Sequence, residues 1–154
     1  MDCYTAALTL LSRRELSARQ LRDRLARRKY PADEIDPVIT RLTQDGTLDD
    51  RRVALASAHL AVVGKRRGRR RILQEIQRLG VSPATAKQAV DEVFAEIDES
   101  ALLDRAIDRR LKDVDPKSLD RPARARLVRS LVGQGFDADQ VYARLRTRAV
   151  ESDE

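Results

Sequence analysis

Six positive charges fall within seven consecutive residues near the middle of this 154-residue chain. They surround Gly68 and are Lys65, Arg66, Arg67, Arg69, Arg70 and Arg71. Like charges repel when they are this crowded, so such a run either lies in solvent without a partner or meets an anion. Most of these residues are arginines, whose planar guanidinium groups bind phosphate and carboxylate through paired hydrogen bonds. We therefore predict that this basic loop binds nucleic-acid phosphate or an acidic protein surface.

The net charge of +6 hides an uneven distribution along the chain. Residues 1–50 carry 9 basic and 9 acidic side chains, and residues 98–154 carry 12 of each. Residues 51–97 carry 10 basic and 4 acidic side chains. The sequence therefore places the net positive charge in the middle third, where the basic loop supplies most of it.

The helix pairs could in principle be helix-turn-helix units that read duplex DNA, but the charge of their second helices argues against this. A recognition helix that enters the major groove needs a neutral or basic exposed face. Residues 32–45 hold one base against four acids, and residues 84–97 hold one against three. Only residues 138–149 keep this possibility open. Their three arginines are secondary candidates for a basic contact: Arg144, Arg146 and Arg148.

Residues that commonly carry enzymatic chemistry are scarce. His59 is the only histidine, and its uncharged surroundings predict a packed or partly buried side chain rather than a general base. Cys3, the only cysteine, is expected near a frayed end of the chain without a histidine nearby in sequence to activate it. One Cys and one His cannot build a zinc site, which leaves open only a metal site made of carboxylates. We predict a protein that is not an enzyme and has no catalytic residue, metal or cofactor.

Composition also indicates where the chain works. Its longest stretch without an acidic or basic residue, Val53–Gly64, is shorter than the ~18 to 20 apolar residues that span a bilayer. The first residues lack the basic and apolar segments of a secretory signal, and one cysteine cannot form an internal disulfide. We expect a cytoplasmic protein with no membrane contact. Three Tyr, two Phe and no Trp argue against stacking nucleic-acid bases on aromatic side chains.

Apolar residues recur at steps of three and four along nearly the whole chain, which predicts an all-helical fold. The pattern also repeats, because three segments align without a gap and keep their apolar residues in register. The first two sets of aligned residues are Leu21, Ile72 and Leu127, followed by Leu25, Ile76 and Leu131. We therefore expect one helical unit to occur three times.

Each copy is predicted to be a helix, a short turn and a second helix. Gly80 and Gly135 suit the left-handed conformation that ends a helix. Phe136 comes next in the third copy and can pack on the following helix, which Asp137 can cap. The first copy departs from this pattern, because Lys29 stands where the other two copies have glycine.

A further amphipathic segment precedes each helix pair, so the sequence predicts nine helices in three three-helix units. These preceding segments are at about residues 4–13, 50–63 and 100–114. A short helix pair cannot bury its own apolar face, so consecutive units are expected to stack into an elongated, curved rod. The predicted units and the acidic tail that follows them are residues 1–48, 49–98, 99–150 and 151–154.

Several short motifs keep a fixed order along the chain. They are the turn Gly46–Asp50 followed by Val53 and Ala54, the basic loop around Gly68, Ile72, Glu75–Ile76, Gly80–Val81 and Gly135–Phe136. In this order and spacing they resemble the RecX family of recombination regulators. The resemblance extends from about Ala6 to Ala149 and is most specific over residues 46–81.

The resemblance implies three tandem repeats that lodge in the groove of the RecA recombinase filament on DNA. Family members modulate the filament, mainly by inhibiting its ATP hydrolysis and strand exchange, and so act in recombination, DNA repair and the SOS response. The resemblance assigns Lys65–Arg71 to the filament groove or its DNA. It implies that the turn of Leu48, Asp49 and Asp50 keeps the first two repeats in register. Nothing in the sequence demands a dimer, so we expect a monomer.

One alternative function does not need the recombinase. The chain would then be a stand-alone helical module that binds DNA without sequence preference through its arginine-rich loop, with an affinity that falls steeply as salt increases.

Overall fold

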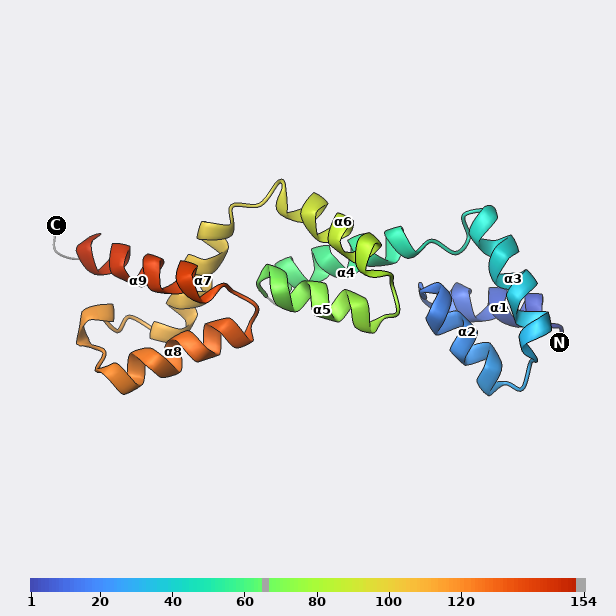
Figure 1. The fold of residues 1–154 in the computed structure, drawn as a ribbon, viewed down its shortest axis with the longest axis horizontal. Helices are drawn as coiled ribbons and strands as arrows, with labels where there is room; N and C mark the ends of the chain where they lie inside the picture. Colours follow the sequence, from blue (N-terminus) through green and yellow to red (C-terminus); the bar gives the residue numbers. More distant parts are fainter. Residues whose placement is uncertain (65–66, 152–154) are drawn as a thin grey trace.

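The computed structural model describes residues 1–64 and 67–151, and every regular element in these residues is helical. The helices form three groups that follow one another end to end as an elongated rod (Figure 1). The first group is α1 (Cys3–Arg13), α2 (Ala18–Arg27) and α3 (Ala32–Gln44). The second is α4 (Asp50–Val63), α5 (Arg69–Arg78) and α6 (Pro83–Phe94). The third is α7 (Glu99–Leu111), α8 (Arg121–Gly133) and α9 (Ala138–Glu151).

The prediction of an all-helical fold is confirmed. We propose that the three groups are the units expected at 1–48, 49–98 and 99–150. The acidic tail falls almost wholly outside the described residues, and Glu151 is the last residue of α9. In the part of the chain that the structure describes, no helix is long and apolar enough to cross a membrane.

The turn inside each group passes through a left-handed residue. Gly80 and Gly135 have φ angles of +89° and +105°, a conformation that glycine adopts without steric penalty. Lys29 takes the same conformation in the first group, with φ of +73°, although it has a side chain. The carboxylate of Asp137 then accepts hydrogen bonds from the backbone N–H groups of Asp139 and Gln140, at 2.9 and 3.3 Å. The third turn therefore ends one helix and caps the next, as expected.

Helix α7 ends earlier than the sequence pattern predicted. It stops at Leu111 rather than near residue 114, because Lys112 and Asp113 both adopt left-handed angles, with φ of +47° and +72°. A single 3₁₀ turn, Pro116–Ser118, occupies part of the connection to α8. Two consecutive left-handed residues cannot continue a right-handed helix, so the expected last turn of α7 does not form.

Two side chains lie differently from what their neighbours in sequence suggested. His59 is exposed on α4 rather than packed. Cys3 is buried in the first turn of α1 rather than at a frayed end. Burial, helped by the negative charges of Glu34 and Asp2, raises the pKa of the Cys3 thiol. Cys3 is therefore a packed, protonated side chain.

The buried apolar residues form two separate cores. The first core belongs to α1–α3 and the turn after them, with Leu21, Leu25 and Leu42 fully buried. The second core runs without a break from α4 to α9, so the second and third groups share it. The rod therefore consists of one group with its own core and two groups with a common core.

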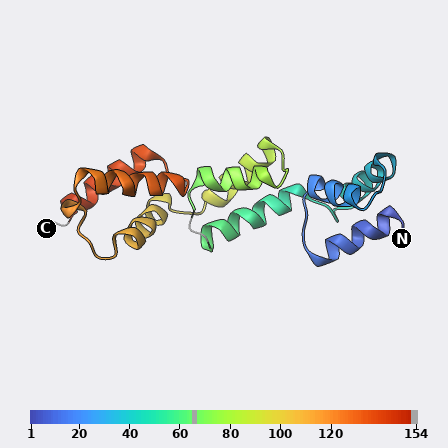
Figure 2. The ribbon, with the colours of Figure 1, turned by 90° about the horizontal axis from the view of Figure 1, so that it is seen from below.

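Polar contacts join the first group to the second. The fully buried hydroxyl of Ser17 donates a hydrogen bond to the carbonyl of Leu79. The backbone N–H of Ala18 donates to the carboxylate of Asp50 at 2.8 Å. Arg52 pairs with Glu15, at 2.8 Å between Nε and Oε1. The turn that ends at Asp50 thus contacts the start of α2, and Figure 2 shows the two groups end to end from below.

Candidate functional site

The basic loop predicted from the sequence is only partly a loop. Lys65 and Arg66 lie outside the described residues. Helix α5 begins at Arg69, with Gly68 as its N-terminal cap. Arg69, Arg70 and Arg71 therefore form the first turn of a helix, and their backbone positions are fixed by it.

Gly68 brings the second group into backbone contact with the third. Its N–H donates to the carbonyl of Gln134 at 2.8 Å, and the N–H of Arg70 donates to the carbonyl of Gly135 at 3.3 Å. A Cβ atom on Gly68 would lie 2.5 Å from the carbonyl carbon of Gly135, and one on Gly135 would lie 2.6 Å from the backbone nitrogen of Arg71. Both positions therefore require glycine, and Gly135 has a second role beyond ending α8.

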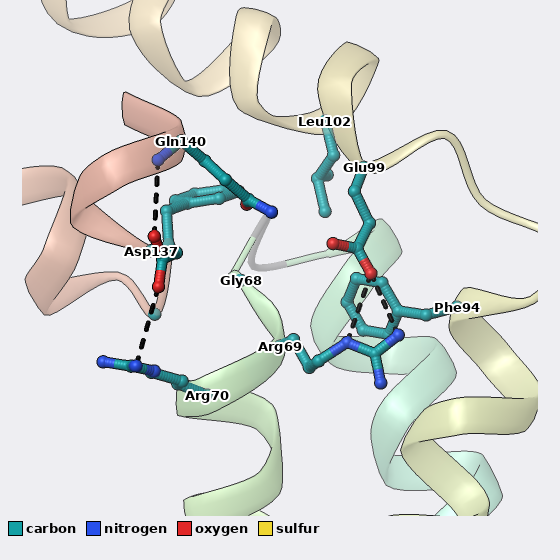
Figure 3. Close-up of a pocket in the computed structure, with 10 residues that line it drawn as sticks. Gly68, Arg69, Arg70, Phe94, Glu99, Leu102, Asp137 and Gln140 are labelled. Atoms are coloured by element: carbon teal, nitrogen blue, oxygen red, sulfur yellow. Dashed lines mark hydrogen bonds and ion pairs between the residues drawn. The ribbon is translucent and has the colours of Figure 1, made fainter. Parts of the chain in front are cut away.

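Arg69 links three helices at this joint (Figure 3). Its guanidinium donates to Glu99 at the start of α7, at 3.0 and 3.2 Å, and to Asp91 on α6 at 2.5 Å. It also lies over the ring of Phe94, 5.0 Å from the ring centre, in a cation–π contact. Hydrogen bonds from Lys87 and from Arg69 lower the pKa of Asp91, so its carboxylate stays charged as the partner of Arg69.

The neighbouring arginines also have partners within the chain. Arg71 donates to the carbonyl of Gly133 at 2.9 Å, and its Nε lies 3.5 Å from the carboxylate of Glu75. Arg67 pairs with the same carboxylate. Arg70 is held most weakly: its guanidinium is 3.6 Å from Asp137, and its side chain is 69% exposed.

A cavity of about 230 Å³ lies between the first turns of α5, α7 and α9 (Figure 3). Its lining is Gly68, Arg69, Arg70, Phe94, Glu99, Leu102, Gly135, Phe136, Asp137 and Gln140. Four of the six basic residues of the loop, Arg67 and Arg69–Arg71, therefore contact carboxylates or carbonyls of this chain. We name this contact between the second and third groups the arginine joint, formed by Arg67–Arg71 with Glu75, Asp91, Glu99 and Asp137.

The three secondary candidates on α9 also differ in whether they have a partner within the chain. Arg144 binds both carboxylate oxygens of Asp104 on α7, at 2.5 and 2.8 Å, and both side chains are half-buried. These hydrogen bonds raise the pKa of Arg144. Arg148 binds the carbonyl of Asp104 at 3.3 Å and pairs with Asp108. Only Arg146 of the three is exposed and, among the described residues, unpaired. The arginines that kept a DNA-reading role open for α9 thus mainly attach it to α7.

Replacing Arg144 with alanine is expected to lower the free energy of unfolding by about 1.5–3 kcal/mol, because Asp104 would keep its half-buried charge and lose a two-point partner. Arg146→Ala is a matched control two residues away, and we expect a change within about 0.5 kcal/mol because its side chain is exposed. Urea denaturation of both variants measures the difference. Equal losses would show that the Asp104 pair does not stabilise the fold.

Sequence reasoning missed the acidic side of these contacts. Asp91, Glu99, Asp104 and Asp137 were counted as charges or helix caps and not as partners of particular arginines. Their position in the chain gives no signal, because Arg69 and Glu99 are 30 residues apart. In the described ranges, no group of three or more His, Cys, Asp or Glu side chains is placed to hold a metal ion.

The fold and the arginine joint define an all-helical protein built of three-helix groups. Charged side chains connect neighbouring groups. A model of the first three-helix domain of RecX matches residues 3–42. The regulatory protein RecX of Trichlorobacter lovleyi is 31% identical over 143 residues, which cover 91% of each chain. That of Halorhodospira halophila is 35% identical over 138 residues, covering 90% of this chain and 83% of the relative. This chain belongs to the RecX family.

Solved structures show the same fold. The crystal structure of RecX from Lactobacillus salivarius superposes with a TM-score of 0.81 and covers 96% of this chain and 95% of its own. Its sequence is 17% identical, so this likeness concerns the fold alone. The family expected from the order of short motifs is confirmed.

Proposed function

We propose that this chain binds the filament that the RecA recombinase forms on DNA and restrains its ATP hydrolysis and strand exchange. Membership of the RecX family is the observation that carries this proposal. The chain would act as a monomer in the cytoplasm, where its DNA-bound partner works. It would act by binding and would catalyse no reaction itself.

The shape of the chain supports inhibition by bridging. An elongated rod of three groups presents long faces to a partner (Figures 1 and 2). Such a rod can contact neighbouring subunits of a polymer at once and oppose the movements between them that accompany ATP turnover. The arginine joint supports this mechanism because it fixes the second group against the third. Inhibition of this kind needs no catalytic residue.

The rate of ATP hydrolysis by RecA on single-stranded DNA tests the proposal. We expect purified protein to slow hydrolysis at equimolar or lower ratios to RecA. An unchanged rate at several-fold excess would contradict the proposal. Boiled protein at the same concentration serves as the control for effects of added protein.

The same assay tests whether the basic loop touches the partner. Removing all its arginines would also break the arginine joint, so Arg70→Ala is the clean probe, because Arg70 is 69% exposed and weakly paired. We expect this variant to inhibit less well than the intact protein if the loop faces the filament. The same inhibition curve for both proteins would place the contact elsewhere.

The alternative function, DNA binding through the arginine-rich loop alone, gains little support from the geometry. The guanidinium groups of Arg67, Arg69 and Arg71 are held by Glu75, by Asp91 and Glu99, and by the carbonyl of Gly133. Lys65 and Arg66 remain candidates from the sequence. A DNA contact through the loop would therefore depend on these two residues and on the weakly held Arg70.

A further inference from the structure

The outward face of α4 carries apolar side chains and no charge. From Val53 to Gly64 the chain has no acidic or basic residue, although 36% of all its residues are charged. Leu60 and Val63 lie one helical turn apart on this face and are 66% and 80% exposed. Figure 2 shows α4, coloured teal to green, along an outer edge of the second group. An apolar helix face that is left exposed in this way is typical of a contact with another protein.

The other large apolar residues that are exposed in the described chain lie singly along the sequence. They are Met1, Leu8, Val114, Val132, Tyr142 and Val150. Single exposed apolar residues are normal on protein surfaces and indicate no partner. Leu60 and Val63 differ because they are neighbours on one helix and because a groove adjoins them.

This groove has a volume of about 500 Å³ and lies beside the end of α4. Helices α4, α6 and α7 and the turn between the last two supply its apolar lining, which is Val62, Val63, Val93, Ile97 and Leu102. Leu102 also lines the cavity of the arginine joint, so the groove borders that joint. We name the residues that line this groove, together with Leu60, the α4 groove. A segment bound there would contact the second and third groups at once.

The charged side chains of the α4 groove are acidic on balance. Glu96 and Asp98 contribute two carboxylates against the single guanidinium of Arg105. Asp98 already accepts hydrogen bonds from two backbone N–H groups at the start of α7, at 3.0 and 3.2 Å. Glu96 is exposed and, among the described residues, has no hydrogen-bond or ion-pair partner. Such a groove repels phosphate and is complementary to an apolar segment that also carries a basic side chain.

We propose that the α4 groove holds the protein partner of this chain, and that the occupant is an amphipathic segment of a RecA subunit. Apolar side chains of that segment pack on Leu60 and Val63, and a basic side chain pairs with Glu96. Amphipathic helices bind apolar grooves in this manner, with anchors at helical spacing. The inference rests on the proposed function and adds the surface that carries it.

Biolayer interferometry tests the apolar part of this contact. RecA filaments on single-stranded DNA with a non-hydrolysable ATP analogue would be immobilised, at a salt concentration that abolishes binding of the protein to DNA alone. The key variant combines Leu60→Gln with Val63→Gln, which keeps the net charge and suits a helix. We expect it to bind at least about tenfold more weakly, because two apolar anchors lose their favourable burial.

The control for this variant combines Val132→Gln with Val150→Gln. It also removes two exposed apolar side chains, from α8 and α9. We expect its affinity to stay within about threefold of the intact protein, since exposed positions outside a contact contribute little. Circular dichroism before the titration checks that both variants are folded.

Reversing the charge of Glu96 tests for the basic side chain in the partner. Glu96→Lys is expected to weaken binding at least about fivefold, because two positive charges would then face each other. Asp23→Lys is the matched control, because Asp23 is exposed on α2, unpaired among the described residues, and gives the same change in net charge. We expect this control to stay within about twofold of the intact protein.

Three results would overturn the proposal. In the first, the Leu60 and Val63 variant would lose no more affinity than its control. In the second, sedimentation velocity would show a dimer of the intact protein that this variant does not form, which would assign the α4 groove to a second copy. In the third, the intact protein would not bind the filaments. Only the third result would also overturn the proposed function, so the two failures can be told apart.

Discussion

Replacing Gly135 with alanine is expected to lower the free energy of unfolding of the second and third groups by at least about 3 kcal/mol. Two effects add at this position. Its φ of +105° strains any residue with a Cβ. The new Cβ would also lie 2.6 Å from the backbone nitrogen of Arg71, which is part of a helix and cannot move alone. The arginine joint would have to open, and urea denaturation measures the loss.

Gly46→Ala separates these two effects. Gly46 has a similar left-handed angle, with φ of +80°, but no atom lies within 4 Å of the Cβ it would gain. We expect this control to cost about 1 kcal/mol, which is the backbone strain alone. Equal losses for Gly46→Ala and Gly135→Ala would show that close packing at the joint adds nothing.

Replacing Leu25 with alanine is expected to destabilise the first group by about 2–5 kcal/mol and to leave the rest of the rod nearly unchanged. Leu25 is fully buried in the core of α1–α3, which is separate from the core of α4–α9. Regions with separate cores can open separately. In native-state hydrogen exchange, amides of α1–α3 should therefore lose protection while those of α4–α9 keep it.

Leu131 is the matched control, because it holds the corresponding place in the third repeat and is also fully buried. Leu131→Ala should reduce protection throughout α4–α9, since these helices share one core. If either substitution lowered protection evenly from α1 to α9, the rod would be a single cooperative unit and the two-core description would be wrong.

The sequence predicted the helices and turns well where local chemistry determines them. Gly80 and Gly135 ended helices as expected, because few residues other than glycine adopt positive φ angles readily. The end of α7 could not be predicted, because Lys112 and Asp113 take left-handed angles without such a signal. The left-handed angle of Lys29 also has no signal in the residue itself. Only the alignment of Lys29 with the glycines of the other copies indicates it.

The site was less predictable than the fold. The charge of Arg69 is visible in the sequence, but its partner Glu99 comes from the next group and is placed by packing. The sequence therefore could not indicate that Arg67, Arg69, Arg70 and Arg71 have ion-pair partners within the chain. The repeat alignment places α2, α5 and α8 at equivalent positions, and each of these helices carries four arginines.

Direct binding to the filament tests the central claim most simply. RecA filaments assembled on single-stranded DNA with a non-hydrolysable ATP analogue would be sedimented with the labelled protein. The salt concentration would be high enough to abolish binding of the protein to DNA alone. The account predicts that the protein sediments with the filaments and stays in solution when RecA is omitted. Protein that stays in solution with several-fold excess filament would contradict it.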